Sequence, residues 1–200
     1  NLLQNQVDIG LVPVAILPEM PEYFIDSEYC IGANGPVGSV AIFSQVPLED
    51  ADTVLLDYQS RTSVNLARIL LKHYWKKEVR FEQAKEGYQY QITGSTAGVV
   101  IGDRAFAQKT LSAYEYDLAQ AWKDFSGLPF VFAAWVANKA LPEAFIDDFD
   151  NGGQVRNVYS QTDLAYSPNF VGSSTFAFKA FKNAEIALLN GHKLVNAIAQ

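Results

Sequence analysis

Short, strongly apolar segments alternate along this chain with segments whose apolar residues recur at helical spacing. The first apolar segment, residues 7–17 (VDIGLVPVAIL), contains several β-branched residues and is closed by Pro18. A run of this kind is typical of a strand buried on both faces, as in a parallel sheet that helices cover. Strands that alternate with helices predict an α/β protein.

The same pattern predicts the remaining elements. Further strands are expected at residues 29–33, 37–45, 53–57, 97–102 and 128–136, and helices at 62–75, after Asp117, from Pro142 and over 176–199. Asp117 is a typical helix N-cap, and Gly127 is a typical glycine at a helix C-terminus. Residues 151–174, rich in Gly, Ser, Asn and Gln, indicate no clear element.

The composition excludes several classes of partner. Of the 200 residues 49% are hydrophobic and 18% are charged, as in a soluble globular protein. The formal net charge of −7 argues against nucleic acid or an anionic membrane as a partner, because both require a basic surface. No apolar run approaches the ~20 residues of a membrane-spanning helix. The single cysteine, Cys30, favours a cytoplasmic protein over a disulfide-bonded secreted one.

The strongest local signal is the tetrapeptide Ser60, Arg61, Thr62 and Ser63 at the start of a predicted helix. Free backbone N–H groups and the helix dipole make a helix N-terminus a natural anion site. The hydroxyls would add donors, and Arg61 could clamp a carboxylate through two N–H groups. The alternative is ordinary capping by one hydroxyl, with Arg61 a solvated surface charge.

Two further loops meet predicted strands. Residues 35–39 (GPVGS) would expose backbone donors at Gly38 and a hydroxyl at Ser39, or would form a plain turn. Asp103 follows a strand, where α/β sheets place ligand-contacting groups, although Asp103 and Arg104 could equally cap a helix and pair with surface charges. No metal-ligand spacing, Walker loop or dinucleotide fingerprint occurs, so neither a metal nor a cofactor is expected.

Five segments together resemble the chorismate dehydratase family, which catalyses the first step of the futalosine route to menaquinone. They are VDIGLVPVA (7–15), GPVGSVAIFS (35–44), LDYQSRTSVNLARILL (56–71), AGVVIGDRAF (97–106) and YDLAQAWKDFSGLPFVFAAWVANK (116–139). The resemblance covers residues 1–142. It implies the two-lobed fold of type II periplasmic binding proteins, with the ligand held between the lobes.

The resemblance also implies how the chain is divided. Crossings between lobes are expected near Gln45 and Leu128, so that residues 1–45 and 128–200 form one lobe and residues 46–127 the other. The loops at Ser39 and at residues 60–63 would then face the ligand from opposite lobes. Family members begin with a strand and helix of roughly 30 residues ahead of VDIGLVPVA. By this resemblance we expect these 200 residues to lack that unit, and with it an active-site asparagine.

The implied activity is that of a hydro-lyase. Chorismate would lose water to give 3-[(1-carboxyvinyl)oxy]benzoate, with Gly38, Ser39 and residues 60–63 binding the dianion. Asp57 and Asp103 are the only readable candidates for a general base, and Asp57 could instead hold the loop before Ser60. A substrate-assisted elimination, in which the enolpyruvyl carboxylate takes the proton, is therefore favoured. The alternative is a solute-binding protein of the same fold for a small carboxylate. The sequence leaves the oligomeric state open.

Overall fold

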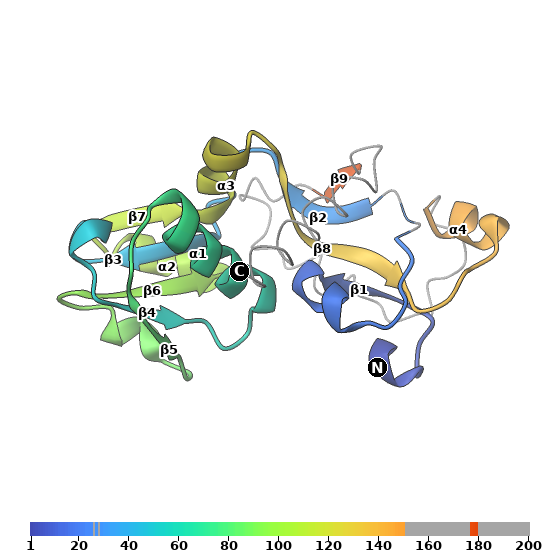
Figure 1. The fold of residues 1–200 in the computed structure, drawn as a ribbon, viewed down its shortest axis with the longest axis horizontal. Coiled ribbons are helices and arrows are strands. Elements are labelled where there is room, and N and C mark those ends of the chain that lie inside the picture. Colours follow the sequence, from blue (N-terminus) through green and yellow to red (C-terminus); the bar gives the residue numbers. More distant parts are fainter. Residues whose placement is uncertain (26, 28, 151–176, 180–200) are drawn as a thin grey trace.

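Two β-sheets lie side by side in the computed structural model, with helices packed around and between them (Figure 1). The structure describes residues 1–25, 27, 29–150 and 177–179. Among these residues no helix has both the length and the apolar character needed to cross a bilayer. The α/β class expected from the sequence is confirmed.

The larger sheet has five strands in the order β5-β4-β6-β3-β7. Its strands are β3 (Val40–Ser44), β4 (Thr53–Leu56), β5 (Arg80–Gln83), β6 (Thr96–Ile101) and β7 (Tyr114–Asp117). Strand β4 runs parallel to β5 and β6, whereas β3 runs antiparallel to β6 and β7. The sheet is therefore mixed, and the expectation of a parallel sheet holds only for its β5-β4-β6 part.

Successive side chains of a strand point to opposite faces of a sheet, and in this sheet both faces are apolar. Helices cover both of these faces. On one face Val54 and Leu56 pack in a core with α1 (Arg61–Ile69) and α3 (Leu118–Ser126). On the other face Leu55 packs with the short 3₁₀ helix η5 (Tyr88–Gln91) and with α2 (Asp103–Lys109). Burial on both faces, predicted for residues 53–57, is confirmed for β4.

The smaller sheet has the order β1-β8-β2-β9, and all neighbouring strands in it are antiparallel. Its strands are β1 (Ile9–Pro13), β2 (Tyr29–Ala33), β8 (Phe130–Ala137) and β9 (Ala177–Lys179). The expectation of a fully buried parallel strand over residues 7–17 is wrong. Among the described residues β1 is an edge strand that pairs with β8 alone, and after Pro13 the chain enters the 3₁₀ helix η2 (Val14–Glu19).

The helix predicted from Pro142 is present as α4 (Glu143–Asp150). The helix predicted over 176–199 is wrong at Ala177–Lys179, which form strand β9. The rest of that prediction lies outside the described residues, as do residues 151–174.

The chain passes between the sheets at residues 34–39 and again at residues 127–129. The first crossing was expected near Gln45. It lies earlier, before β3. Strand β3 pairs with β6 and β7, so it belongs to the five-stranded sheet. The strand that begins at Tyr29 ends at Ala33 because Gly35, with φ +125°, and Pro36 break the extended backbone.

One continuous apolar core joins the two sheets. It includes Leu17 from η2, Leu66 from α1 and Val136 from β8, all of them buried. Helix α1 contacts both η2 and β8 across the junction. The amino end of α1, which carries the predicted anion site, therefore lies where the two sheets meet (Figure 1).

Candidate functional site

Three of the predicted residues lie at one edge of the five-stranded sheet. Asp57 and Asp103 follow the adjacent parallel strands β4 and β6. Ser39 precedes the antiparallel strand β3, and its carbonyl oxygen accepts the Gly102 N–H at 2.8 Å. In Figure 1 this edge, marked by the arrowheads of β4 and β6, is the one toward the four-stranded sheet. We call it the site edge.

The same geometry corrects one expectation. The loops at Ser39 and at residues 60–63 were predicted to face a ligand from opposite lobes. Both adjoin strands of the five-stranded sheet, because β3 pairs there with β6 and β7. They therefore belong to one side of the junction.

Two of the three hydroxyls at the start of α1, those of Ser60 and Thr62, already have partners within the protein, whereas Ser63 is buried and its backbone N–H is the donor to Ser60. Ser60 is the N-cap, and its Oγ accepts the Ser63 N–H at 3.0 Å. The buried Thr62 hydroxyl donates to the carbonyl oxygen of Phe132 at 3.0 Å and lies 3.4 Å from the N–H of Ala15. The capping alternative thus describes Ser60, while Thr62 links α1 to the other sheet.

Arg61 forms an exposed ion pair with Glu19 of η2. Its Nη1 lies 3.3 Å from Oε2 of Glu19, and the two side chains are 61% and 57% exposed. An exposed ion pair of this kind contributes little to stability. The alternative of a solvated surface charge describes Arg61, and the carboxylate it meets belongs to the protein itself.

The backbone donor predicted at Gly38 is also occupied. Asp117 Oδ2 accepts the N–H groups of Val37 at 2.9 Å and Gly38 at 2.7 Å. Its Oδ1 accepts those of Ala119 and Gln120 at the start of α3, which confirms the predicted N-cap. The 35–39 loop therefore presents its donors to Asp117, and the expectation that the Gly38 N–H faces a ligand is wrong in this structure.

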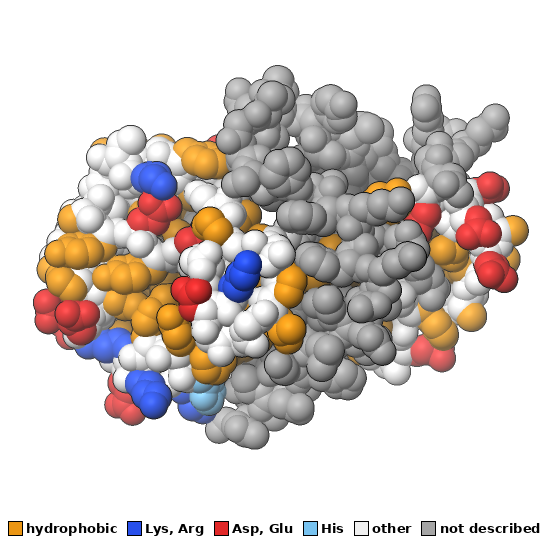
Figure 2. Space-filling model, turned by 90° about the horizontal axis from the view of Figure 1, so that it is seen from above, with side chains coloured by type: hydrophobic (Ala, Val, Ile, Leu, Met, Phe, Trp, Pro, Cys, Tyr) orange, Lys and Arg blue, Asp and Glu red, His pale blue; other side chains and the backbone are white. Residues whose placement is uncertain are grey.

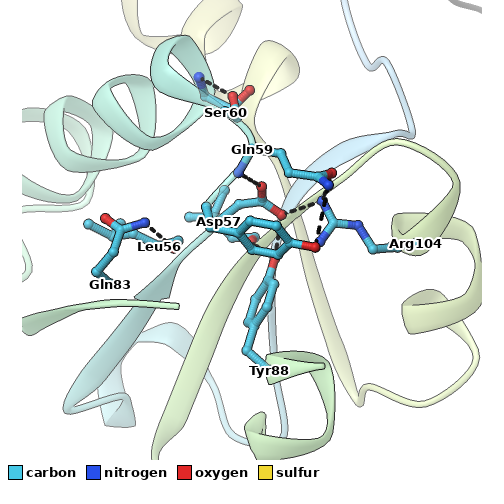
Figure 3. Close-up of polar contacts among 10 residues, drawn as sticks. Leu56, Asp57, Gln59, Ser60, Gln83, Tyr88 and Arg104 are labelled. Atoms are coloured by element: carbon cyan, nitrogen blue, oxygen red, sulfur yellow. Dashed lines mark hydrogen bonds and ion pairs between the residues drawn. The ribbon is translucent and has the colours of Figure 1, made fainter. Parts of the chain in front are cut away.

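Asp57 is fully buried and has three hydrogen-bonding partners (Figure 3). Its Oδ2 accepts from Arg104 Nη2 at 2.7 Å and from the Tyr88 hydroxyl at 2.7 Å. Its Oδ1 accepts the N–H of Gln59 at 2.7 Å. These contacts hold the loop between β4 and Ser60, which was the structural alternative for Asp57.

Tyr88 and Arg104 complete this cluster. Burial, together with the Asp57 carboxylate, raises the pKa of the Tyr88 hydroxyl. The guanidinium carbon of Arg104 lies 5.3 Å from the ring centre of Tyr58 and 5.9 Å from that of Tyr88. Arg104 Nη2 also donates to Oε1 of Gln59 at 2.9 Å. Arg104 therefore pairs with a buried carboxylate, and the expectation of surface pairing is wrong for it.

Asp103 is the first residue of α2, exposed and without an ion-pair partner among the described residues. The contacts of Gln59, Arg104 and Tyr88 with Asp57 were not predicted from the sequence. Gln59 and Arg104 directly adjoin the predicted Ser60 and Asp103, so their positions could have drawn attention to them. Tyr88 has no such signal, because it lies on a separate 3₁₀ helix.

Neither a metal cluster nor the described cavity coincides with the site edge. Within the described part of the chain, no group of His, Cys, Asp and Glu could hold a metal ion. A cavity of about 310 Å³ lies beside α4 and is lined by residues that include Phe24, Leu141 and Ile146. None of the predicted site residues lines it.

A family described as menaquinone biosynthesis matches residues 1–156 of this sequence. The chain belongs to this family. A curated chorismate dehydratase from Thermus thermophilus is 26% identical over 157 residues, which are 70% of this chain and 52% of that protein. Membership of the chorismate dehydratase family, predicted from the sequence blocks, is thereby confirmed. This chain spans about half the length of that relative.

Solved structures resemble the fold of this family member. The crystal structure of protein AF1704 from Archaeoglobus fulgidus superposes with a TM-score of 0.61 at 11% identity, covering 98% of this chain and 80% of that one. An ABC transporter structure from Parabacteroides distasonis gives a TM-score of 0.46 at 15% identity, covering 76% of this chain and 55% of that one. At 11% identity the likeness to AF1704 shows the fold alone.

Proposed function

We propose that the full-length protein is a chorismate dehydratase, a hydro-lyase that converts chorismate to 3-[(1-carboxyvinyl)oxy]benzoate and water. The observation that carries this proposal is the family match over residues 1–156, together with the chorismate dehydratase relative. Because the chain spans about half of that relative, the activity is proposed for the whole protein. A cytoplasmic location stays a prediction.

The polar groups of the site edge support binding of a small dianion. Ser60 Oγ accepts from Ser63, which leaves the hydroxyl proton of Ser60 to donate to a ligand. Ser39, 5% exposed, brings a second hydroxyl to the same edge. On the face drawn in Figure 2, Lys and Arg side chains are scattered and have acidic neighbours. On that face (Figure 2) recognition of an anion would depend on local donors and not on a broad basic patch.

The arrangement of Asp57 bears on the mechanism. Elimination of water requires removal of the proton on the ring carbon that carries the enolpyruvyl ether. A general base must come within hydrogen-bond reach of that proton. The Asp57 side chain is 0% exposed and both its oxygens have donors, so it would have to break three contacts first. This supports the substrate-assisted route, with Asp103 the remaining candidate for a protein base.

In the proposed mechanism the protein orients chorismate and excludes water, while the enolpyruvyl carboxylate accepts the proton. Orientation and desolvation of this kind contribute several kcal/mol to a rate, on the order of 7 kcal/mol or more for orientation in well-aligned cases. Aromatisation of the ring supplies the driving force for loss of the hydroxyl. No strongly basic side chain is then needed.

The two sheets are proposed to be the two lobes of a type II periplasmic-binding-protein-like fold, with the ligand between them. Support comes from the two crossings at residues 34–39 and 127–129, and from the superposition on AF1704. With the first crossing placed there, the lobe of the five-stranded sheet runs from about Val40 to Ser126.

The function is tested by incubating full-length protein with chorismate and following the aromatic enolpyruvyl ether by mass spectrometry. Product formation in proportion to enzyme is expected. Tight binding of chorismate without turnover would instead identify a solute-binding protein, and would overturn the proposed activity.

A further inference from the structure

The hydrogen-bonding capacity of Arg104 is only partly used. Its Nη2 donates to Asp57 at 2.7 Å and to Gln59 at 2.9 Å. Its Nη1 is buried and has no partner among the described residues. An unpaired buried donor on a charged group is costly, and in native structures it calls for an explanation.

Arg104 also fixes the orientation of the Gln59 side chain. A guanidinium only donates, so the amide group of Gln59 must turn its oxygen toward Arg104, as Figure 3 shows. The amide nitrogen donates one N–H to the hydroxyl oxygen of Tyr58 at 3.3 Å, and its second N–H has no partner among the described residues. Gln59 and Tyr58 are both exposed, so this nitrogen is a donor at the surface of the site edge.

Asp57 does not compete with an anion for these two donors. Both oxygens of Asp57 are turned to their partners in the interior, which limits its repulsion of a second carboxylate. The Tyr58 ring lies over the guanidinium of Arg104 and is 40% exposed. Nη1 is itself buried, so a ligand would reach it only if the exposed Tyr58 ring turned aside, since Tyr88 on the other side is buried.

We propose that Arg104 and Gln59 form a carboxylate-binding pair, with Nη1 of Arg104 and Nε2 of Gln59 as its donors. Asp57 and Tyr88 are positioning residues that hold the guanidinium in place. The inference rests on the proposed function, since it assigns this pair to one of the two carboxylates of chorismate. It also takes the role that the sequence offered for Arg61 as one of two alternatives.

The test uses calorimetric titration of the full-length protein with chorismate. Gln59→Glu is the main variant, because residue 59 is exposed and the change keeps the acceptor toward Arg104 while removing the donor. Loss of a hydrogen bond to a charged group predicts a dissociation constant about 10- to 100-fold higher. Gln83→Glu is the matched control. Gln83 ends β5 at the same edge and donates to the carbonyl oxygen of Leu56, so a change within about threefold is expected.

Arg104→Lys keeps the charge but loses the planar fork, and predicts a weakening similar to that of Gln59→Glu. Arg68→Lys is its control, since Arg68 stacks on Phe81 elsewhere on the surface. Equal affinities in Gln59→Glu and Gln83→Glu, with wild-type binding intact, would overturn the carboxylate pair alone. Absence of chorismate binding by the wild-type protein would overturn the proposed function and this assignment together.

Discussion

The hydroxyl of Thr62 donates to the carbonyl oxygen of Phe132 over 3.0 Å, and so ties the first turn of α1 to strand β8 of the other sheet. The residue is 3% exposed, and its Oγ1 also lies 3.4 Å from the N–H of Ala15. A hydroxyl that resembles a ligand donor in the sequence is, in the structure, a buried contact between the sheets.

Replacement of Thr62 by Val is expected to destabilise the protein. The change keeps the shape but leaves the carbonyl of Phe132 without this donor, which costs about 1–3 kcal/mol of unfolding free energy. Thr62→Ser keeps the hydroxyl and should cost clearly less. Urea denaturation measures both variants. A Thr62→Val protein as stable as the wild type would contradict the role of this contact.

Substitution by Ala is expected to lower the free energy of unfolding strongly at Asp57 and hardly at all at Asp103. Asp57 is buried and paired with Arg104, so its removal breaks a buried ion pair, at a cost of about 3 kcal/mol. Arg104 is 27% exposed, which allows water to offset part of this loss. Asp103 is exposed, and its substitution should stay within about 0.5 kcal/mol. Thermal unfolding compares the two, and equal destabilisation would contradict the assignment.

Asp103 also tests the proposed mechanism in the full-length protein. Asp103→Asn should leave turnover of chorismate within about tenfold of wild type if the substrate supplies its own base, whereas a protein base contributes about 10²- to 10⁴-fold. A loss of that size in Asp103→Asn, with unchanged chorismate binding, would identify Asp103 as the base and refute the substrate-assisted route.

Asp117 is expected to control the loop at the first crossing between the sheets. Its carboxylate holds the N–H groups of Val37 and Gly38 and caps α3. Asp117→Ala should speed hydrogen exchange at both amides and cost about 1–2 kcal/mol through the lost cap. Asp124→Ala is the control, because the partner of Asp124 among the described residues is the Gln120 side chain. Unchanged exchange at Val37 and Gly38 would refute this role.

Local patterns predicted much of the fold. Strand β2 was predicted with its observed bounds, and β4, β6 and α3 within one or two residues, because apolar runs and caps are short-range signals. Strand β7 and the edge strand β5 were missed, since they are short and only partly buried. The direction of β1 depends on pairing with β8, more than 100 residues away, and no local pattern encodes it.

The candidate site was predictable in place but not in detail. Sequence reasoning located the loops at Ser39, Ser60 and Asp103, because strand ends and helix starts can be read from spacing. It could not show that Asp117 occupies the Gly38 N–H or that Arg104 reaches Asp57. Each of these contacts joins residues about 50 to 80 positions apart.

Cys30 predicts a pH dependence of stability. Burial raises the pKa of the Cys30 thiol in the folded protein, so the unfolded chain loses this proton first as the pH rises. The resulting stabilisation is present below the unfolded pKa of about 8.5 and is lost as the pH climbs toward the folded value. Wild-type protein should therefore lose more stability than Cys30→Ala between neutral and alkaline pH. Parallel urea titrations that show equal losses would contradict this.

Turnover of chorismate by the full-length protein is the most direct test of the proposed dehydratase activity. Time-resolved proton NMR would follow the resonance of the proton on the ring carbon that carries the enolpyruvyl ether. If the protein is a dehydratase, the loss of this resonance equals, mole for mole, the amount of 3-[(1-carboxyvinyl)oxy]benzoate that forms. A spectrum in which chorismate binds and remains unchanged would contradict it.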